Sequence, residues 1–161
     1  MSKKHIRPTI ILAGDHAGYV LKEIIKEYLL SMDYPVKDKG TFSVAPVDFP
    51  DFCIPAAEEV AGSHGKKLGI VFGGTGLGES IAANKVKGIR CAHIDDPFTA
   101  EMSRFHNNAN MIALGGRTVT KDPNFAKQLV HIWLETKFSN VHRHVRRLKK
   151  IAMYEAKPSR H

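Results

Sequence analysis

Glu79 ends a glycine-rich stretch, GGTGLGE at 73–79, that comes directly after the apolar run LGIVF. Gly74, Gly76 and Gly78 permit tight turns that direct several backbone N–H groups into one concavity. Such a loop can hold a phosphate of a nucleotide, but the lysine of a P-loop is absent. The alternative is that the amides stabilise a developing oxyanion while Glu79 moves a proton beside it. Glu79 is also a favourable capping residue at a helix start.

Asp15 and His16 follow another apolar run, TIILA, within the stretch GDHAG. An Asp–His pair in a turn is commonly a structural cap. If the two apolar runs are neighbouring parallel strands, this pair lies opposite the glycine-rich stretch. That position favours a chemical role for Asp15 and His16.

A second polar group surrounds the run NMIALG. His106, Asn107 and Asn110 lie in RFHNNAN, the short connection that leads into this run, and Arg117 follows in GGRT. Such histidines and asparagines commonly satisfy turn backbone, but together they also supply an acid/base group with oxyanion donors. If NMIALG is a strand of a parallel sheet, Arg117 is predicted at the edge of that sheet where the strands end.

Two further histidines and both cysteines are interpreted as structural. His93 lies inside a predicted strand and His131 inside a predicted amphipathic helix. Cys53 and Cys91 lie far apart in unrelated elements, so the sequence indicates neither a zinc site nor a disulfide.

Alternating strand and helix patterns position these residues. The predicted strands are 9–13, 34–38, 68–72, 89–94 and 110–115. The predicted helices are 18–32, 50–62, 78–88, 97–107 and 122–135, with Asp122 as an N-cap before Pro123. Because Pro55 is tolerated best in a first turn, the second helix is expected to begin near Ile54 and to stop at Gly62.

Strands that alternate with helices form right-handed βαβ units around a parallel sheet. The predicted fold class is therefore α/β, a Rossmann-like three-layer αβα sandwich with five parallel strands in the flavodoxin-like order 2-1-3-4-5. In that order the loops after strands 1 and 3 flank the switch point where ligands of such folds bind.

Length and composition bound the remaining possibilities. A chain of 161 residues, 43% hydrophobic and 25% charged, predicts one globular domain over 1–161. No apolar run is long enough for a membrane span, and the N-terminus lacks the apolar region of a signal peptide. The expected location is the reducing cytoplasm, with no membrane partner.

The formal net charge of +8 requires an explanation. Much of it falls in HRHVRRLKKI at 142–151 and in the lysine-rich start. A nucleic-acid surface is one possibility, although no binding motif or interleaved aromatic residues accompany the basic run. A solvated helix face and a small phosphorylated ligand are the other two.

A last helix is predicted at about 140–155, beyond the helix that follows strand 5. Its apolar stripe consists of Val141, Val145, Leu148 and Ala152, and Arg143 and Arg147 lie four residues apart on a neighbouring face. Such a stripe suggests docking on a second subunit, with 138–161 as a C-terminal dimerisation arm. The alternative is a helix folded back on its own sheet.

Together these strings resemble the ribose-5-phosphate isomerase B family, which also includes galactose-6-phosphate and allose-6-phosphate isomerases. The matching strings are GDHAG, VDFPDF, GGTGLGESIAANK, HNNAN, GGR and RHVRR. They run in order from Ile10 to about Ile151. The resemblance implies a homodimer, or a tetramer of such dimers, with active sites between subunits and no metal, organic cofactor or nucleic-acid partner.

The resemblance also implies catalytic roles. His106 resembles the group that opens the furanose ring, with Asp15 hydrogen-bonded to the sugar. Glu79 resembles the base that moves a proton between C2 and C1. Asn107 and the amides of the loop would stabilise a cis-enediolate, with Thr75 among the catalytic residues.

Substrate binding is implied by the same resemblance. The phosphate clamp would consist of His16 and Arg117, joined by Arg143 and Arg147 from the partner's C-terminal arm. Gly74, Gly76, Leu77 and Gly78 would contact the substrate through their backbone.

Two positions depart from the family pattern. Many relatives have a cysteine base at the position of Gly73, and Glu79 is the acid found in the branch that lacks this cysteine. Phe49 stands where many members have the tyrosine of a DYP string. The contact that the tyrosine hydroxyl makes in those members is therefore missing here or supplied by another group.

The implied activity is the reversible isomerisation of ribose 5-phosphate and ribulose 5-phosphate in the pentose phosphate pathway. One alternative is a six-carbon substrate, allose 6-phosphate or galactose 6-phosphate. The other is a non-catalytic flavodoxin-like module that binds a nucleotide or nucleic acid.

Overall fold

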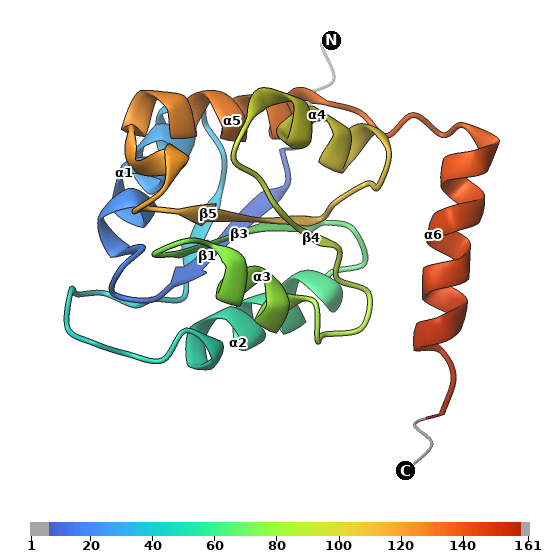
Figure 1. Ribbon diagram of the computed structural model, residues 1–161, viewed down its shortest axis with the longest axis horizontal. Helices are drawn as coiled ribbons and strands as arrows, with labels where there is room; N and C mark the ends of the chain where they lie inside the picture. The colour runs from blue at the N-terminus through green and yellow to red at the C-terminus, as the bar shows by residue number, and fades with distance from the viewer. Residues whose placement is uncertain (1–6, 159–161) are drawn as a thin grey trace, which may run out of the picture.

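The computed structural model describes residues 7–158 and has a five-stranded parallel sheet between two layers of helices (Figure 1). The strands are β1 (Thr9–Gly14), β2 (Val36–Asp38), β3 (Lys67–Gly73), β4 (Cys91–His93) and β5 (Met111–Gly115). The helices are α1 (Tyr19–Ser31), α2 (Pro50–Ala61), α3 (Leu77–Ala83), α4 (Pro97–Phe105), α5 (Pro123–Glu135) and α6 (His142–Glu155), with a short 3-10 turn at Val119–Lys121. The predicted α/β sandwich is confirmed.

The strand order is β2-β1-β3-β5-β4, so the predicted order 2-1-3-4-5 is wrong in its last two places. All of β5 is buried, whereas β4 has three residues of which only Cys91 is buried, and a short, partly exposed strand suits a sheet edge. Right-handed crossover connections explain how the chain runs from β3 to the edge strand β4 and then back to β5. The chain covers one face with α3 on its way out to β4 and the opposite face with α4 on its way back.

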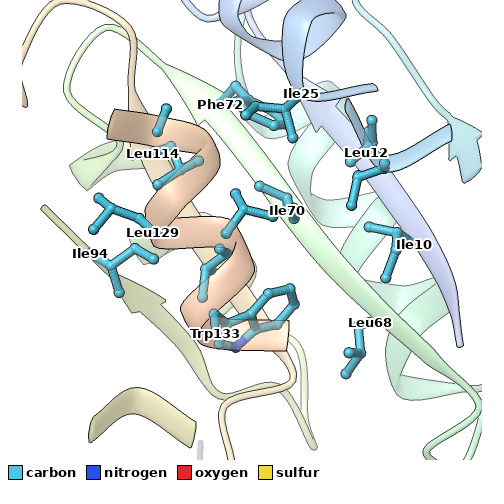
Figure 2. Close-up of a cluster of buried hydrophobic side chains, with 14 of the residues drawn as sticks. Ile10, Leu12, Ile25, Leu68, Ile70, Phe72, Ile94, Leu114, Leu129 and Trp133 are labelled. Carbon is cyan, nitrogen blue, oxygen red and sulfur yellow. The ribbon is translucent and has the colours of Figure 1, made fainter. Parts of the chain in front are cut away.

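The helices pack on the sheet through two separate hydrophobic cores. One core lies between the sheet and α1, α4 and α5, and its centre includes Ile70, Phe72 and Trp133 (Figure 2). The other lies beneath α2 and α3 and contains smaller side chains such as Ala56 and Ala83. With both faces buried, the ends of the strands are where polar chemistry is accessible.

The second helix begins earlier than predicted. Helix α2 starts at Pro50, not near Ile54, and contains Pro55 in its interior. Pro55 has no N–H to donate to the residue four positions earlier, a loss that usually ends or kinks a helix. Here Cys53 before the proline and Ala56 and Ala57 after it are all fully buried in one core, so packing holds the helix on both sides of Pro55.

Helix α6 stands apart from the sandwich. It lies beside the amino ends of the strands, set off from both layers of helices (Figure 1). Val145, Ile151 and Tyr154 are exposed on it, so the alternative of a helix folded back on its own sheet is wrong. Among residues 7–158, no helix has the length and apolar character needed to cross a membrane.

Candidate active site

The loops after β1, β3 and β5 meet at the carboxyl edge of the sheet. The Asp15 N–H donates to the carbonyl of Phe72 at 3.1 Å, and the Arg117 N–H donates to the carbonyl of Gly74 at 2.9 Å. Because β5 lies directly beside β3, the corrected strand order is what places Arg117 against the glycine-rich loop. The predicted convergence of these segments is therefore present.

Close approach and backbone conformation require glycine at position 76. Gly76 has φ of 80°, in the left-handed region, and a Cβ there would lie 3.0 Å from the backbone of Leu114. The residue caps α3, whose first turn contains Leu77 and Glu79. The loop thus leads into the helix while lying tightly against β5.

Glu79 is buried although it carries an ionisable carboxyl group. Its exposed fraction is 3%, and a Cβ built on Gly73 would overlap its carboxylate. Burial is the largest cause that raises the pKa of Glu79 above its ordinary value, and the neighbouring Asp15 carboxylate adds to the shift. The backbone N–H groups of Glu79 and Gly76 lower this pKa in part. A carboxylate whose pKa is raised is a stronger base than an exposed one.

Asp15 performs the structural role that its position in a turn indicates. Its Oδ1 accepts hydrogen bonds from the N–H groups of Ala17 at 2.9 Å and Gly18 at 3.0 Å. These bonds orient the carboxylate at the start of α1, close enough to influence Glu79. The capping and chemical interpretations of Asp15 are therefore compatible.

His16 lines a pocket of about 470 Å³ together with Pro46–Asp48 and the first turn of α2. Its Nδ1 accepts a hydrogen bond from the Val47 N–H at 3.2 Å. In a neutral ring the proton is therefore on Nε2, which can donate to a ligand. The ring of Phe49 packs beside Gly78, where a Cβ would lie 2.9 Å from Phe49 Cζ.

Arg117, which follows β5, and His93, which ends β4, both contact the glycine-rich loop after β3. The Arg117 side chain lies over Gly74, with Nη1 3.5 Å from the position of a Cβ there. His93 Nε2 lies 2.9 Å from the carbonyl oxygen of Thr75, and its ring packs against Gly76. The sequence interpretation of His93 as purely structural missed this contact. The available signal was its place at the carboxyl end of an edge strand.

His106 and Asn107 lie at the opposite edge of the sheet from Glu79. They follow α4 and precede β5, so they belong to the amino edge. Five residues of β5 separate the two edges by about 15 Å at the usual rise of a strand. Asn110 fills a structural role beside them, because its side chain accepts from the Arg90 N–H and donates to the carbonyl of Gly88.

Helix α6 brings a second histidine to His106. The His144 ring centroid is 4.5 Å from that of His106, and His144 Nδ1 lies 2.6 Å from Ser139 Oγ. Burial is the largest cause that lowers the pKa of His144, followed by the nearby Arg143, His106 and Arg147. His144 was not singled out from the sequence, and as the one buried residue of α6 it anchors the start of that helix.

The predicted site residues therefore form two groups. The carboxyl-edge group consists of Asp15, His16, Gly74, Thr75, Gly76, Leu77, Gly78, Glu79 and Arg117. The amino-edge group consists of His106, Asn107, Arg143 and Arg147. Within one chain the sheet lies between them, and no single cleft holds both.

Among residues 7–158, no group of three or more histidine, cysteine, aspartate or glutamate side chains is arranged to hold a metal ion. Cys53 and Cys91 are free and buried. The arrangement at the carboxyl edge offers a buried base, backbone donors and a cationic side chain. These groups suit proton transfer beside a carbonyl oxygen in an anionic substrate.

Comparison with known proteins identifies the class. The sequence profile of the Ribose/Galactose Isomerase family matches residues 10–151. Ribose-5-phosphate isomerase B of Mycobacterium tuberculosis (strain H37Rv) is 44% identical over 147 residues, which cover 91% of this chain and 89% of that protein. The chain belongs to this family of sugar phosphate isomerases.

Two solved structures agree in fold. Ribose-5-phosphate isomerase B of Clostridium thermocellum superposes with a TM-score of 0.86 at 44% identity, over 91% of this chain and 97% of that one. Ribose-5-phosphate isomerase B of Mycoplasma genitalium with bound ribulose-5-phosphate superposes with a TM-score of 0.89 at 39% identity, over 96% of this chain and 100% of that one.

Proposed function

We propose that this protein is a ribose-5-phosphate isomerase that interconverts ribose 5-phosphate and ribulose 5-phosphate, a reaction of the pentose phosphate pathway in the cytoplasm. The observation that carries the proposal is the buried Glu79 carboxylate at the mouth of a loop of backbone donors, in a chain of this family. The solved relative with bound ribulose-5-phosphate supports the choice of a five-carbon sugar.

In the proposed mechanism, Glu79 removes the proton from C2 of the open-chain aldose and returns it to C1. The hydroxyl proton moves from O2 to O1 in the same sequence, so the product is the ketose with no net loss of atoms. The N–H groups of the loop from Gly74 to Gly78 stabilise the negative charge of the cis-enediolate between these steps. The raised pKa of Glu79 suits a carboxylate that must accept a carbon-bound proton.

Ring opening and phosphate binding use the remaining residues. His106 transfers the proton that opens the furanose ring, and Asp15 orients the sugar hydroxyl. His16, through Nε2–H, and Arg117 bind the phosphate. Arg143 and Arg147 complete the clamp with charge-assisted hydrogen bonds to the dianion.

These roles require two copies of the chain. Since His106 and Glu79 lie at opposite edges of one sheet, the His106 that serves Glu79 comes from a second subunit, together with Asn107 and both arginines of α6. The exposed apolar residues of α6 and the exposed Leu77 and Ile81 of α3 are surfaces that such a homodimer buries. Residues 138–161 would then be the arm that packs on the partner.

Glu79 takes the place of the cysteine base that many relatives carry at position 73. A side chain at this position would occupy the space that the Glu79 carboxylate fills. A cysteine base at position 73 and a glutamate base at position 79 therefore exclude each other. A glycine at 73 and an acid at 79 are one coupled feature, which supports assignment to the branch that lacks the cysteine.

The test is an isomerase assay of the purified protein with a metal chelator present. We expect conversion of ribose 5-phosphate to ribulose 5-phosphate, with slower turnover of allose 6-phosphate and galactose 6-phosphate. Faster turnover of a six-carbon substrate would instead assign the protein as an allose-6-phosphate or galactose-6-phosphate isomerase of the same family. No turnover of any of the three sugars would contradict an isomerase function.

A further inference from the structure

His93 ends β4 at the same edge of the sheet as the glycine-rich loop. Its Nε2 lies 2.9 Å from the carbonyl oxygen of Thr75. A carbonyl oxygen can only accept a hydrogen bond, so Nε2 carries the proton and donates it. The contact thereby fixes both the tautomer of His93 and the direction of the Thr75 carbonyl.

The direction of that carbonyl determines where the Gly76 N–H points. In a trans peptide the C=O and the following N–H point in opposite directions. With the Thr75 carbonyl held toward His93, the Gly76 N–H is directed away from it, and this N–H is one of the backbone donors that act on the Glu79 carboxylate.

The Thr75–Gly76 peptide needs such a constraint. Gly76 has φ of 80°, but glycine populates negative φ about as readily, so its own backbone does not select one orientation of the preceding peptide. Thr75 is exposed, and its Oγ1 accepts one long hydrogen bond, from the Leu77 N–H at 3.3 Å. The hydrogen bond from His93 stabilises the orientation that presents the amide to Glu79.

Other ionisable groups also face Glu79 and must be separated from this effect. Asp15 approaches from the loop after β1, Cys53 from α2, and Cys91 and His93 from β4. When protonated, His93 also acts on Glu79 through its charge. A useful experiment must distinguish that charge from the hydrogen bond.

We propose that His93 is a positioning residue, which holds the Thr75–Gly76 peptide so that its N–H serves Glu79 and the developing oxyanion. The proposal rests on the proposed function in one respect, namely that Glu79 is the base. It gives His93 a role through the loop backbone rather than through contact with substrate.

The experiment compares His93→Leu, which cannot donate, with His93→Gln, whose side-chain amide places an N–H donor near the position of Nε2. His131→Leu is the matched control, because it makes the same change at an exposed position on α5. Each variant is assayed for kcat and KM on ribose 5-phosphate. The titration of Glu79 is followed separately by carbon-13 NMR of its carboxyl carbon, assigned by the signal lost in Glu79→Gln.

We expect His93→Leu to lose about 10- to 100-fold in kcat with KM nearly unchanged, by analogy with the loss of a hydrogen bond that orients a metal ligand. We expect the apparent pKa of Glu79 to rise in His93→Leu, because the Gly76 N–H no longer favours the anion. His93→Gln should restore most of both quantities without restoring any charge, and His131→Leu should match wild type.

Wild-type kcat in His93→Leu would overturn the proposal while leaving the isomerase function intact. Equal upward shifts of the Glu79 pKa in both variants would show that only the charge of His93 acts, and would also overturn it. If wild type turns over no sugar phosphate, the proposed function fails. The NMR titration then still decides whether His93 acts on Glu79 through the peptide.

Discussion

The carboxyl and amino edges of this sheet carry two different sets of candidate functional residues. At the carboxyl edge, Glu79 is 3% exposed, and hydrogen bonds join the loops after β1, β3 and β5 around it. At the amino edge, Asn107 is exposed, and Arg143 and Arg147 lie on a helix that stands away from the sandwich. The fold of one chain positions the first set, and in the proposed homodimer the second set would complete a site of the partner subunit.

The difference follows from what each group must do. A base that abstracts a carbon-bound proton benefits from burial, and the interior of a sandwich can supply that burial within one chain. A phosphate clamp consists of long cationic side chains whose order comes from the ligand and the surrounding surface. If the proposed roles hold, division of the site between the two edges makes activity depend on assembly of a dimer.

The strongest test of the carboxyl edge is Glu79→Gln. The substitution retains the shape of the side chain and removes the base, so kcat should fall by about 10²–10⁴-fold while KM changes little. Glu58→Gln, at an exposed position on α2, is the matched control and should behave as wild type. A Glu79→Gln enzyme with near wild-type kcat would remove Glu79 from the mechanism.

A methyl group at position 73 tests whether activity depends on the exact position of the buried Glu79 carboxylate. Gly73→Ala places a Cβ in the space of the Glu79 carboxylate, and displacement of a catalytic group by 1 Å can lower kcat by about 10²-fold. The double variant Gly73→Ala, Glu79→Gln should be no slower than Glu79→Gln alone, because both changes act on one group. Additive losses would mean that Gly73→Ala damages something else, and unfolding curves would show whether that is the fold.

The division between the two edges can be tested by mixing defective chains. Glu79→Gln is refolded together with a chain carrying Arg143→Ala and Arg147→Ala. Random pairing makes about half of the dimers mixed, and each mixed dimer has one site with an intact base and an intact clamp. Recovery should therefore approach about a quarter of wild-type activity.

The control for the mixing experiment is refolded wild type, which sets the full scale. If base and clamp belong to the same chain, every site in every mixture remains defective. Activity no higher than the sum of the separate variants would then rule out a clamp supplied by the partner. That result would leave Glu79 as the base and return Arg143 and Arg147 to a solvated helix face.

Much of the fold was predictable because its signals are local. Apolar runs mark the strands, and Asp122 before Pro123 marks the start of α5, where the Asp122 side chain accepts from the Asn124 N–H as expected. The order of β4 and β5 was not predictable in this way. It depends on which face of the sheet α4 covers, a choice that the short connections around β4 leave open.

The site was predictable to the extent that it follows strand ends. Asp15, Glu79 and Arg117 each come soon after a strand, so their convergence follows from a parallel sheet. His106 comes before a strand, which already implies the opposite edge once the strands are parallel. The contact of His93 with the loop could not be predicted, because it is one hydrogen bond to the Thr75 carbonyl, which no spacing in the sequence encodes.

The smallest expected effect is that of thiol modification, which separates a glutamate base from a cysteine base. Cys53 and Cys91 are both buried, and burial raises the pKa of each thiol, that of Cys91 to about 12. The thiolate is the reactive form, so neither cysteine should react with iodoacetamide in the native enzyme. Kinetic assays after incubation should show no loss of activity, while the unfolded chain should take up two carboxamidomethyl groups by mass spectrometry. Rapid inactivation that substrate prevents would instead place a cysteine among the groups that contact the sugar, and that cysteine would then share the role of base that we propose for Glu79.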